Sequence, residues 1–282
     1  MREGRKASKP LLWLRLWKTP ANRRRLADIS LLGVTLVWGT TFVLTKSILK
    51  ALDPLTLVAF RFLGATLAMC LIMIGRLRKM DLRLVKAGAS IGMFLFAGHL
   101  LQTMGLLYTS AARAGFITGL SVVIVPFLSF LILKRPTSGS SIAGVMLAAS
   151  GLALLSLRPG DTVTMGLGDL LVLASAVSFA FHIVFVGKYA PYLDVPLLVV
   201  AQVGTVTVVS FALLAILKGI GGLQGWRSGF GLIELKPSFG PAGLKTGFQF
   251  GGLELEVWLG LLFLGVFATA GAFLVQNAAQ RF

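Results

Sequence analysis

The most constraining feature of this sequence is the stretch Leu31–Gly64, in which two long apolar runs are separated by a short polar turn. At a helical rise of about 1.5 Å per residue, each run is long enough to cross a bilayer core of about 30 Å. The turn contains Asp53 and Pro54, and the second run contains one charged residue, Arg61. This pattern predicts a hairpin of two membrane-spanning helices.

Six further apolar runs follow, and turn residues or charges separate them. The eight predicted spans cover residues 29–48, 55–74, 86–107, 112–133, 140–157, 168–187, 196–217 and 257–279. Hydrophobic residues make up 56% of the chain and charged residues 13%, which leaves more apolar surface than a water-soluble fold of this size could bury. The sequence therefore predicts an all-α integral membrane protein. Nucleic-acid binding is disfavoured despite the net charge of +17, because no soluble basic module is present.

The basic residues predict the orientation of the spans. Lys and Arg number 18 in the segments on the N-terminal side of the membrane and 8 in those on the other side. The positive-inside rule then places the N-terminus in the cytoplasm, and we expect the bacterial plasma (inner) membrane. Residues 1–27 hold nine Lys or Arg, and their apolar part is predicted to lie at the membrane surface against anionic lipid. A disordered basic tail is the alternative.

A weak internal repeat divides the chain. Residues 38–46 align with 180–188, and Tyr108 aligns with Gln280, in the same order of features. This predicts an inverted repeat, with five spans in residues 28–158 and three in residues 159–282. Segment 218–256 is rich in glycine and is predicted to be an exterior insertion, in which alternating residues such as Phe248, Phe250 and Leu253–Val257 form a short hairpin or lie on the membrane surface. The last two of ten expected spans have no counterpart, so we expect a fragment or a shortened variant.

Several short motifs in the first half resemble those of the EamA-type family of the drug/metabolite transporter superfamily. They are Trp38-Gly39, Lys46, Pro54, Arg61, Leu107–Ala111, Val125-Pro126, Leu131–Pro136, Gly144 and Gly151. The resemblance implies a helical bundle of two inverted repeats, of which this chain shows eight spans out of ten. It also implies a secondary carrier that moves a small metabolite, amino acid or drug-like molecule through a central cavity between the repeats. Lys134 departs from the acidic residue that the family often has before Arg-Pro.

Other functions remain as alternatives. A transport-incompetent fragment or an assembly partner, for example in a homo-oligomer, would also fit a chain that lacks two spans. A membrane enzyme is disfavoured, because neither histidine has a carboxylate partner or metal-ligand spacing in a span. The single cysteine, Cys70, allows no internal disulfide, and we expect no cofactor or metal. The spans contain no Asp or Glu away from their ends, which disfavours proton coupling through a carboxylate.

Polar residues inside the spans are the candidates for substrate binding, because a polar group in the membrane core is costly and often functional. Each also has a structural alternative: Arg61 as a structural pin, the threonines as helix-packing groups, and each histidine as a singly hydrogen-bonded core residue. Gln276 and Asn277 are weaker candidates, and Gly88-x-x-x-Gly92 is interpreted as a close helix contact. The candidates are Trp38, Thr41, Thr45, Arg61, His99, Gln102, Ser178, His182 and Gln202.

Overall fold

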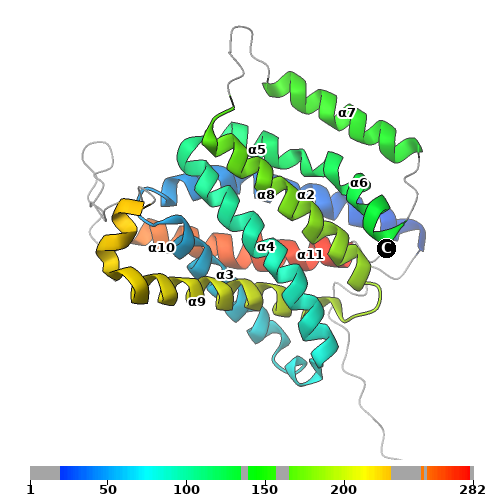
Figure 1. Ribbon diagram of the computed structural model, residues 1–282. Helices are drawn as coiled ribbons and strands as arrows, with labels where there is room; N and C mark the ends of the chain where they lie inside the picture. The colour runs from blue at the N-terminus through cyan, green and yellow to red at the C-terminus, as the bar shows by residue number, and fades with distance from the viewer. Residues whose placement is uncertain (1–19, 135–138, 157–164, 230–248, 251–252, 280–282) are drawn as a thin grey trace, which may run out of the picture.

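The computed structural model describes residues 20–134, 139–156, 165–229, 249–250 and 253–279. Helices form nearly all of this part of the chain (Figure 1). In chain order they are α2 (Pro20–Ile48), α3 (Pro54–Met73), η1 (Leu77–Lys79), α4 (Leu82–Tyr108), α5 (Ala111–Gly119), α6 (Ser121–Leu133), α7 (Gly139–Ser156), α8 (Leu167–Tyr189), α9 (Val195–Gly229), α10 (Leu255–Leu262), η2 (Phe263–Gly271) and α11 (Ala272–Ala279).

Seven helical segments of the described chain are long and apolar enough to cross a membrane. Large apolar side chains also point outward from them, and Leu36, Leu71 and Leu131 are 75%, 71% and 69% exposed. A surface of this kind suits lipid rather than water. The protein is therefore an all-α integral membrane protein, as predicted. The predicted fifth span forms helix α7, which is not among the seven and packs only at the edge of the bundle, against α5 and α6 (Figure 1).

The turns that separate the predicted spans act as helix caps. The side chain of Asp53 accepts a hydrogen bond from the backbone N–H of Thr56 at 2.9 Å, and Pro54 takes the first position of α3. Asp81 caps α4 in the same way through the N–H of Leu84, and Ser110 caps α5 through that of Arg113. A side-chain oxygen at this position satisfies one of the free N–H groups of the first turn, so each of these helices begins where its cap residue lies.

Two segments differ from the predicted boundaries. Helix α2 begins at Pro20, inside the segment that was predicted to lie on the membrane surface, because proline is well suited to the first position of a helix. Helix α9 continues to Gly229, so residues 218–229 are helical rather than part of a loop. Glycine weakens a helix without ending it, and no proline occurs before Pro237.

Strands are confined, in the described residues, to one short hairpin, which is one of the two alternatives that the sequence left open for this segment. Gln249 pairs with Glu254 and Phe250 pairs with Leu253 in antiparallel register. The hairpin immediately precedes α10. The rest of the predicted insertion, residues 230–248 and 251–252, lies outside the described residues, as do residues 1–19.

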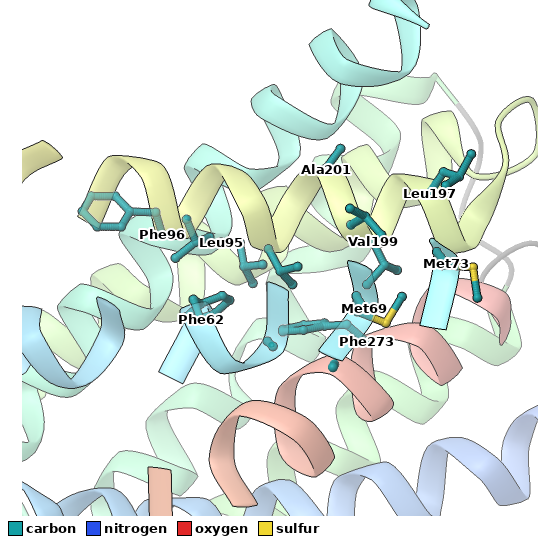
Figure 2. Close-up of a cluster of buried hydrophobic side chains, with 14 of the residues drawn as sticks. Phe62, Met69, Met73, Leu95, Phe96, Leu197, Val199, Ala201 and Phe273 are labelled. Atoms are coloured by element: carbon teal, nitrogen blue, oxygen red, sulfur yellow. The ribbon is translucent and has the colours of Figure 1, made fainter. Parts of the chain in front are cut away.

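The centre of the bundle is built from both halves of the chain. Helix α4 packs along α8 and α9, α3 packs along α9 and η2, and α2 packs against α11. One apolar core lies between α3, α4, α9 and α11, and Figure 2 shows Phe62, Met69, Leu95, Val199 and Phe273 meeting there. Phe273, from α11, lies in this core and also contacts the polar side chains described below.

Close contacts at glycine hold these helices together. A Cβ atom at Gly88 would lie 2.2 Å from the Cβ of Ala201, and one at Gly92 would lie 2.8 Å from the carbonyl oxygen of Gln202. These two glycines of α4 therefore allow α9 to approach closely, as the G-x-x-x-G spacing predicted. This contact sets the position of Gln202, which is one of the candidate residues.

Candidate functional site

Arg61 is a buried cation in the middle of the bundle. It lies on α3, its residue is 4% exposed, and its Nε donates a hydrogen bond to Thr269 Oγ1 at 2.8 Å. Within the described residues no other Arg61 nitrogen has a hydrogen-bond acceptor, and no carboxylate forms an ion pair with the side chain. A charge in this position is costly in a membrane protein, about 2.5–3.5 kcal/mol on insertion scales. It is therefore the strongest candidate for a functional residue.

A π-helical segment, η2, supplies the partner of Arg61. The hydroxyl of Thr269 donates to the carbonyl of Leu264, five residues earlier, at 2.7 Å. Its proton is used in that bond, so its lone pairs face the guanidinium of Arg61. Gly265 lets the segment approach α3, because a Cβ there would lie 2.7 Å from the carbonyl oxygen of Arg61. Segments with π-helical hydrogen bonds are uncommon and occur frequently at functional sites.

Trp38 also binds the π-helical segment η2. Its indole Nε1 donates to the carbonyl oxygen of Ala268 at 2.9 Å, and its ring lies 5.6 Å from that of Phe273. Thr41, one turn away on α2, donates to the carbonyl of Trp38 at 2.6 Å. The first described helix, α2, is thereby attached to η2 and α11 next to Thr269.

His99 is enclosed by aromatic rings. Its ring centroid lies 4.9 Å from that of Phe62, 5.0 Å from that of Phe179 and 6.0 Å from that of Phe273. Its Nδ1 is 3.1 Å from the carbonyl oxygen of Leu95 on its own helix. Phe62 also lies next to Arg61, with the guanidinium carbon 6.0 Å from the ring centroid. The arginine and the histidine therefore share one aromatic wall.

His182 also contacts the ring of Phe273. The two ring centroids are 5.5 Å apart, and His182 Nε2 lies 3.0 Å from Gln202 Oε1 on α9. Both residues are buried. The two histidines therefore contact the same phenylalanine ring, one from α4 and the other from α8.

Several buried amide groups near this ring lack partners. Gln202 Nε2, Gln276 Oε1 and both polar atoms of the Asn277 side chain have no hydrogen-bond partner. Gln276 and Asn277 follow Phe273 by three and four residues on α11, which places all three on one face of that helix. Buried polar groups in proteins are nearly always satisfied, so these atoms are available to bind a ligand or water.

Charged networks lie at the two ends of α8. Near its start, Asp169 is 3% exposed, accepts a hydrogen bond from Thr109 at 2.7 Å and pairs with Arg113 at 3.0 Å. Lys46 donates to the carbonyl of Thr109 at the same end. At the opposite end, Arg76 forms an ion pair with Asp194, just before α9. Each network joins a segment that precedes residue 158 to one that follows it.

The other predicted residues are more peripheral. Thr45 is buried on α2, and Gln102 donates to Thr118 Oγ1 at 3.0 Å, which joins α4 to α5. Ser178 donates to the carbonyl of Ala174 on its own helix and does not reach the cluster. No group of three or more His, Cys, Asp or Glu that could hold a metal ion occurs in the described residues.

The sequence did not predict the roles of Thr269, Ala268 or Phe273. Thr269 is the one hydroxyl residue in the last predicted span, and that signal could have identified it. The π-helical geometry could not have been read in the same way, because it shifts every later residue around the helix axis relative to an α-helix. We use the term central cluster for Trp38, Arg61, His99, His182, Gln202, Thr269 and Phe273.

Comparison with known families agrees with this architecture. The model of the EamA-like transporter family matches residues 25–157. The match covers the first half of the chain, from α2 to the end of α7.

Individual relatives are also transporters by name. An "uncharacterized transporter" of Archaeoglobus fulgidus is 36% identical over 168 residues, which are 60% of this chain and 51% of that protein. The "uncharacterized transporter YyaM" of Bacillus subtilis is 30% identical over 55% of this chain and 53% of its own length. The chain thus spans about half the length of the curated relatives that it matches.

A solved crystal structure shares the fold. It superposes with a TM-score of 0.61 at 19% sequence identity and covers 91% of this chain and 79% of its own. That identity is too low to carry function, but it supports the arrangement of helices across both halves of the chain. Together, the apolar helices and the shared fold identify an integral membrane protein, and its first half matches the EamA-like transporter family.

Proposed function

We propose that this chain is a secondary carrier that moves a small metabolite, amino acid or drug-like molecule across the cytoplasmic membrane, with the central cluster as its substrate site. The observation that carries the proposal is the origin of that cluster. Trp38, Arg61 and His99 come from helices before residue 158, and His182, Gln202 and Thr269 come from helices after it. Carriers built from two repeats bind their substrates between the repeats, near the middle of the membrane.

The chemistry of the cluster suits reversible binding. It combines a cation, two histidines, amide groups without partners and several aromatic rings. A binding site for a small molecule typically has apolar and aromatic walls and a few polar groups that fix the orientation of the ligand. Residues that served only to pack helices would not leave the side-chain amide of Asn277 and the Nε2 of Gln202 without hydrogen-bond partners among the described residues.

The charged networks at the two ends of α8 support a carrier with access from alternate sides. In an N-terminus-inside orientation, Asp169 and Arg113 lie on the exterior side, and Arg76 and Asp194 lie on the cytoplasmic side. We propose this orientation, in a bacterial inner membrane, from the distribution of Lys and Arg. The basic residues before Pro20 would then contact anionic lipid on the cytoplasmic leaflet.

The proposal favours exchange or facilitated diffusion over proton coupling through a carboxylate. Among the described residues, Asp169 is the only buried acid, and it lies at the end of α8 in an ion pair. Carriers that move protons usually place an ionisable residue within the membrane along the pathway. A counterflow experiment, in which internal unlabelled substrate drives the entry of labelled substrate, suits a carrier of this kind.

The test is counterflow of a panel of labelled amino acids, organic acids and aromatic drugs into proteoliposomes that contain the full chain. We expect at least one compound to enter faster than into empty liposomes, and Arg61→Gln to reduce its entry by about tenfold or more. Arg83→Gln is the matched control, because Arg83 is an exposed arginine at the start of α4. The proposal fails if no compound enters, or if Arg61→Gln and Arg83→Gln both transport at the rate of the unaltered chain.

A further inference from the structure

We infer that the substrate of the central cluster is an anion, a carboxylate attached to an apolar or aromatic body, and that Arg61 binds its charged group. This inference rests on the proposed carrier function and names its substrate class. Its basis is Arg61 itself, a cation that is buried between helices and has no countercharge among the described residues.

The guanidinium of Arg61 is held by one hydrogen bond and keeps two nitrogens for a ligand. Thr269 occupies its Nε and fixes the plane of the guanidinium, while Nη1 and Nη2 have no hydrogen-bond acceptor among the described residues. Those two nitrogens present parallel N–H groups, which match the two oxygens of a carboxylate. Since Thr269 donates to Leu264, it keeps its orientation whether or not the substrate is bound. The cluster thus holds the arginine in place for a bidentate contact.

The described residues around Arg61 supply no negative charge to balance it. Both ion pairs of the described chain lie at the ends of α8, and each uses an arginine other than Arg61. The buried carboxylate of Asp169 is satisfied by Arg113 and Thr109. An amine substrate would therefore bring a second positive charge beside Arg61 without a free carboxylate to receive it. A carboxylate substrate would neutralise the charge that the fold leaves uncompensated.

Aromatic rings next to Arg61 and His99 favour an apolar or aromatic body for the substrate. The rings of Phe62, Phe179 and Phe273 surround His99, and Phe62 borders the guanidinium of Arg61. A ligand held at Arg61 would lie against this wall, which suits an aromatic or branched apolar group. Gln202 Nε2 and Asn277 Nδ2 are further donors without partners, and they are available to an additional hydrogen-bond acceptor on the body of the ligand.

The test compares three ligands with the same benzyl body and different charge: phenylacetate, 2-phenylacetamide and phenethylamine. Binding to the full chain in lipid nanodiscs is measured by isothermal titration calorimetry at pH 7.5. We expect phenylacetate to bind about tenfold or more tightly than phenylacetamide, and phenethylamine to bind most weakly. Arg61→Gln should abolish the preference for phenylacetate, and Arg83→Gln should retain it.

A second variant guards against a failure of Arg61→Gln to fold. Thr269→Val keeps the charge of Arg61 and removes the acceptor of its Nε, so it should weaken phenylacetate binding about threefold to tenfold and leave phenylacetamide unchanged. The inference is wrong if the unaltered chain does not bind phenylacetate, if the amide or the amine binds as tightly, or if both variants bind phenylacetate normally. If the protein transports other solutes in counterflow but does not bind phenylacetate, the proposed substrate class is wrong. The proposed carrier function would still stand.

Discussion

At the scale of single residues, the central cluster depends on a few polar atoms with defined partners. Arg61 and Thr269 form one pair, Trp38 and the carbonyl of Ala268 form a second, and His182 and Gln202 form a third. Each pair joins two different helices, so each contributes to helix packing as well as to the proposed site. Substitution of one residue of a pair should therefore lower the free energy of unfolding as well as the rate of transport.

The His182–Gln202 pair allows a test of this dual role. His182→Leu leaves Gln202 Oε1 without a partner, beside an Nε2 that already lacks one. We expect a loss of about 1–3 kcal/mol in the free energy of unfolding, measured by thermal or denaturant unfolding in detergent. The double variant His182→Leu with Gln202→Leu should lose less than the sum of the single variants, because it leaves no orphaned polar group. Strictly additive losses would show that the two side chains are not coupled.

The sequence identified part of the cluster for a clear physical reason. Arg61, His99 and His182 stand out because charged and polar residues are rare in apolar spans. Ser178 stands out in the same way, yet it bonds within its own helix, since sequence does not tell which face of a span points inward. Phe273 could not be distinguished from the many phenylalanines that face lipid.

At the scale of elements, the π-helical segment η2 and the glycines of α4 position the cluster. The π-helical hydrogen bonds bring the carbonyl of Ala268 and the hydroxyl of Thr269 to Trp38 and Arg61. The glycines bring α9 against α4, which carries Gln202 to His182. The G-x-x-x-G spacing predicted the second contact, because small residues at one face are visible in sequence. The π-helix and the end of α5 at Gly119 were not visible, because both depend on tertiary packing.

A substitution at Gly88 tests the close helix contact. Gly88→Leu places side-chain atoms where Ala201 already lies, since even a Cβ would be 2.2 Å from the Cβ of Ala201. We expect a loss of about 1–3 kcal/mol or more in the free energy of unfolding, seen as a lower melting midpoint in detergent. Gly187→Leu is the matched control, because a Cβ at Gly187 meets nothing within 4 Å. Equal melting midpoints for the two variants would contradict the contact.

At the scale of the whole molecule, helices from the two halves of the chain interleave around the central cluster. Composition and the length of the apolar runs were enough to predict a helical membrane protein, because few structures satisfy every backbone hydrogen bond in lipid. The arrangement of the helices in space could not be predicted from the sequence to the same extent. Helix α7 packs at the edge of the bundle, and its main contacts are with α5 and α6. Nothing in the sequence of the fifth predicted span indicated this position.

The orientation is a prediction at this scale. In a Cys70→Ser background, Ser110→Cys should react with a membrane-impermeant maleimide added to intact cells, because Ser110 is exposed at the start of α5. Arg78→Cys, exposed at the other end of the bundle, should react only after the cells are opened. The reverse pattern of labelling would place the N-terminus outside.

The most direct test of the account is chemical modification of Thr269, which is fully buried beside Arg61. In a Cys70→Ser background that retains counterflow, Thr269→Cys is treated with a small methanethiosulfonate reagent during transport. If the central cluster opens to solution in the transport cycle, the reagent should stop counterflow, and saturating substrate should slow the inactivation by about tenfold. A Thr269→Cys protein that transports at an undiminished rate after treatment would contradict a substrate pathway through this cluster.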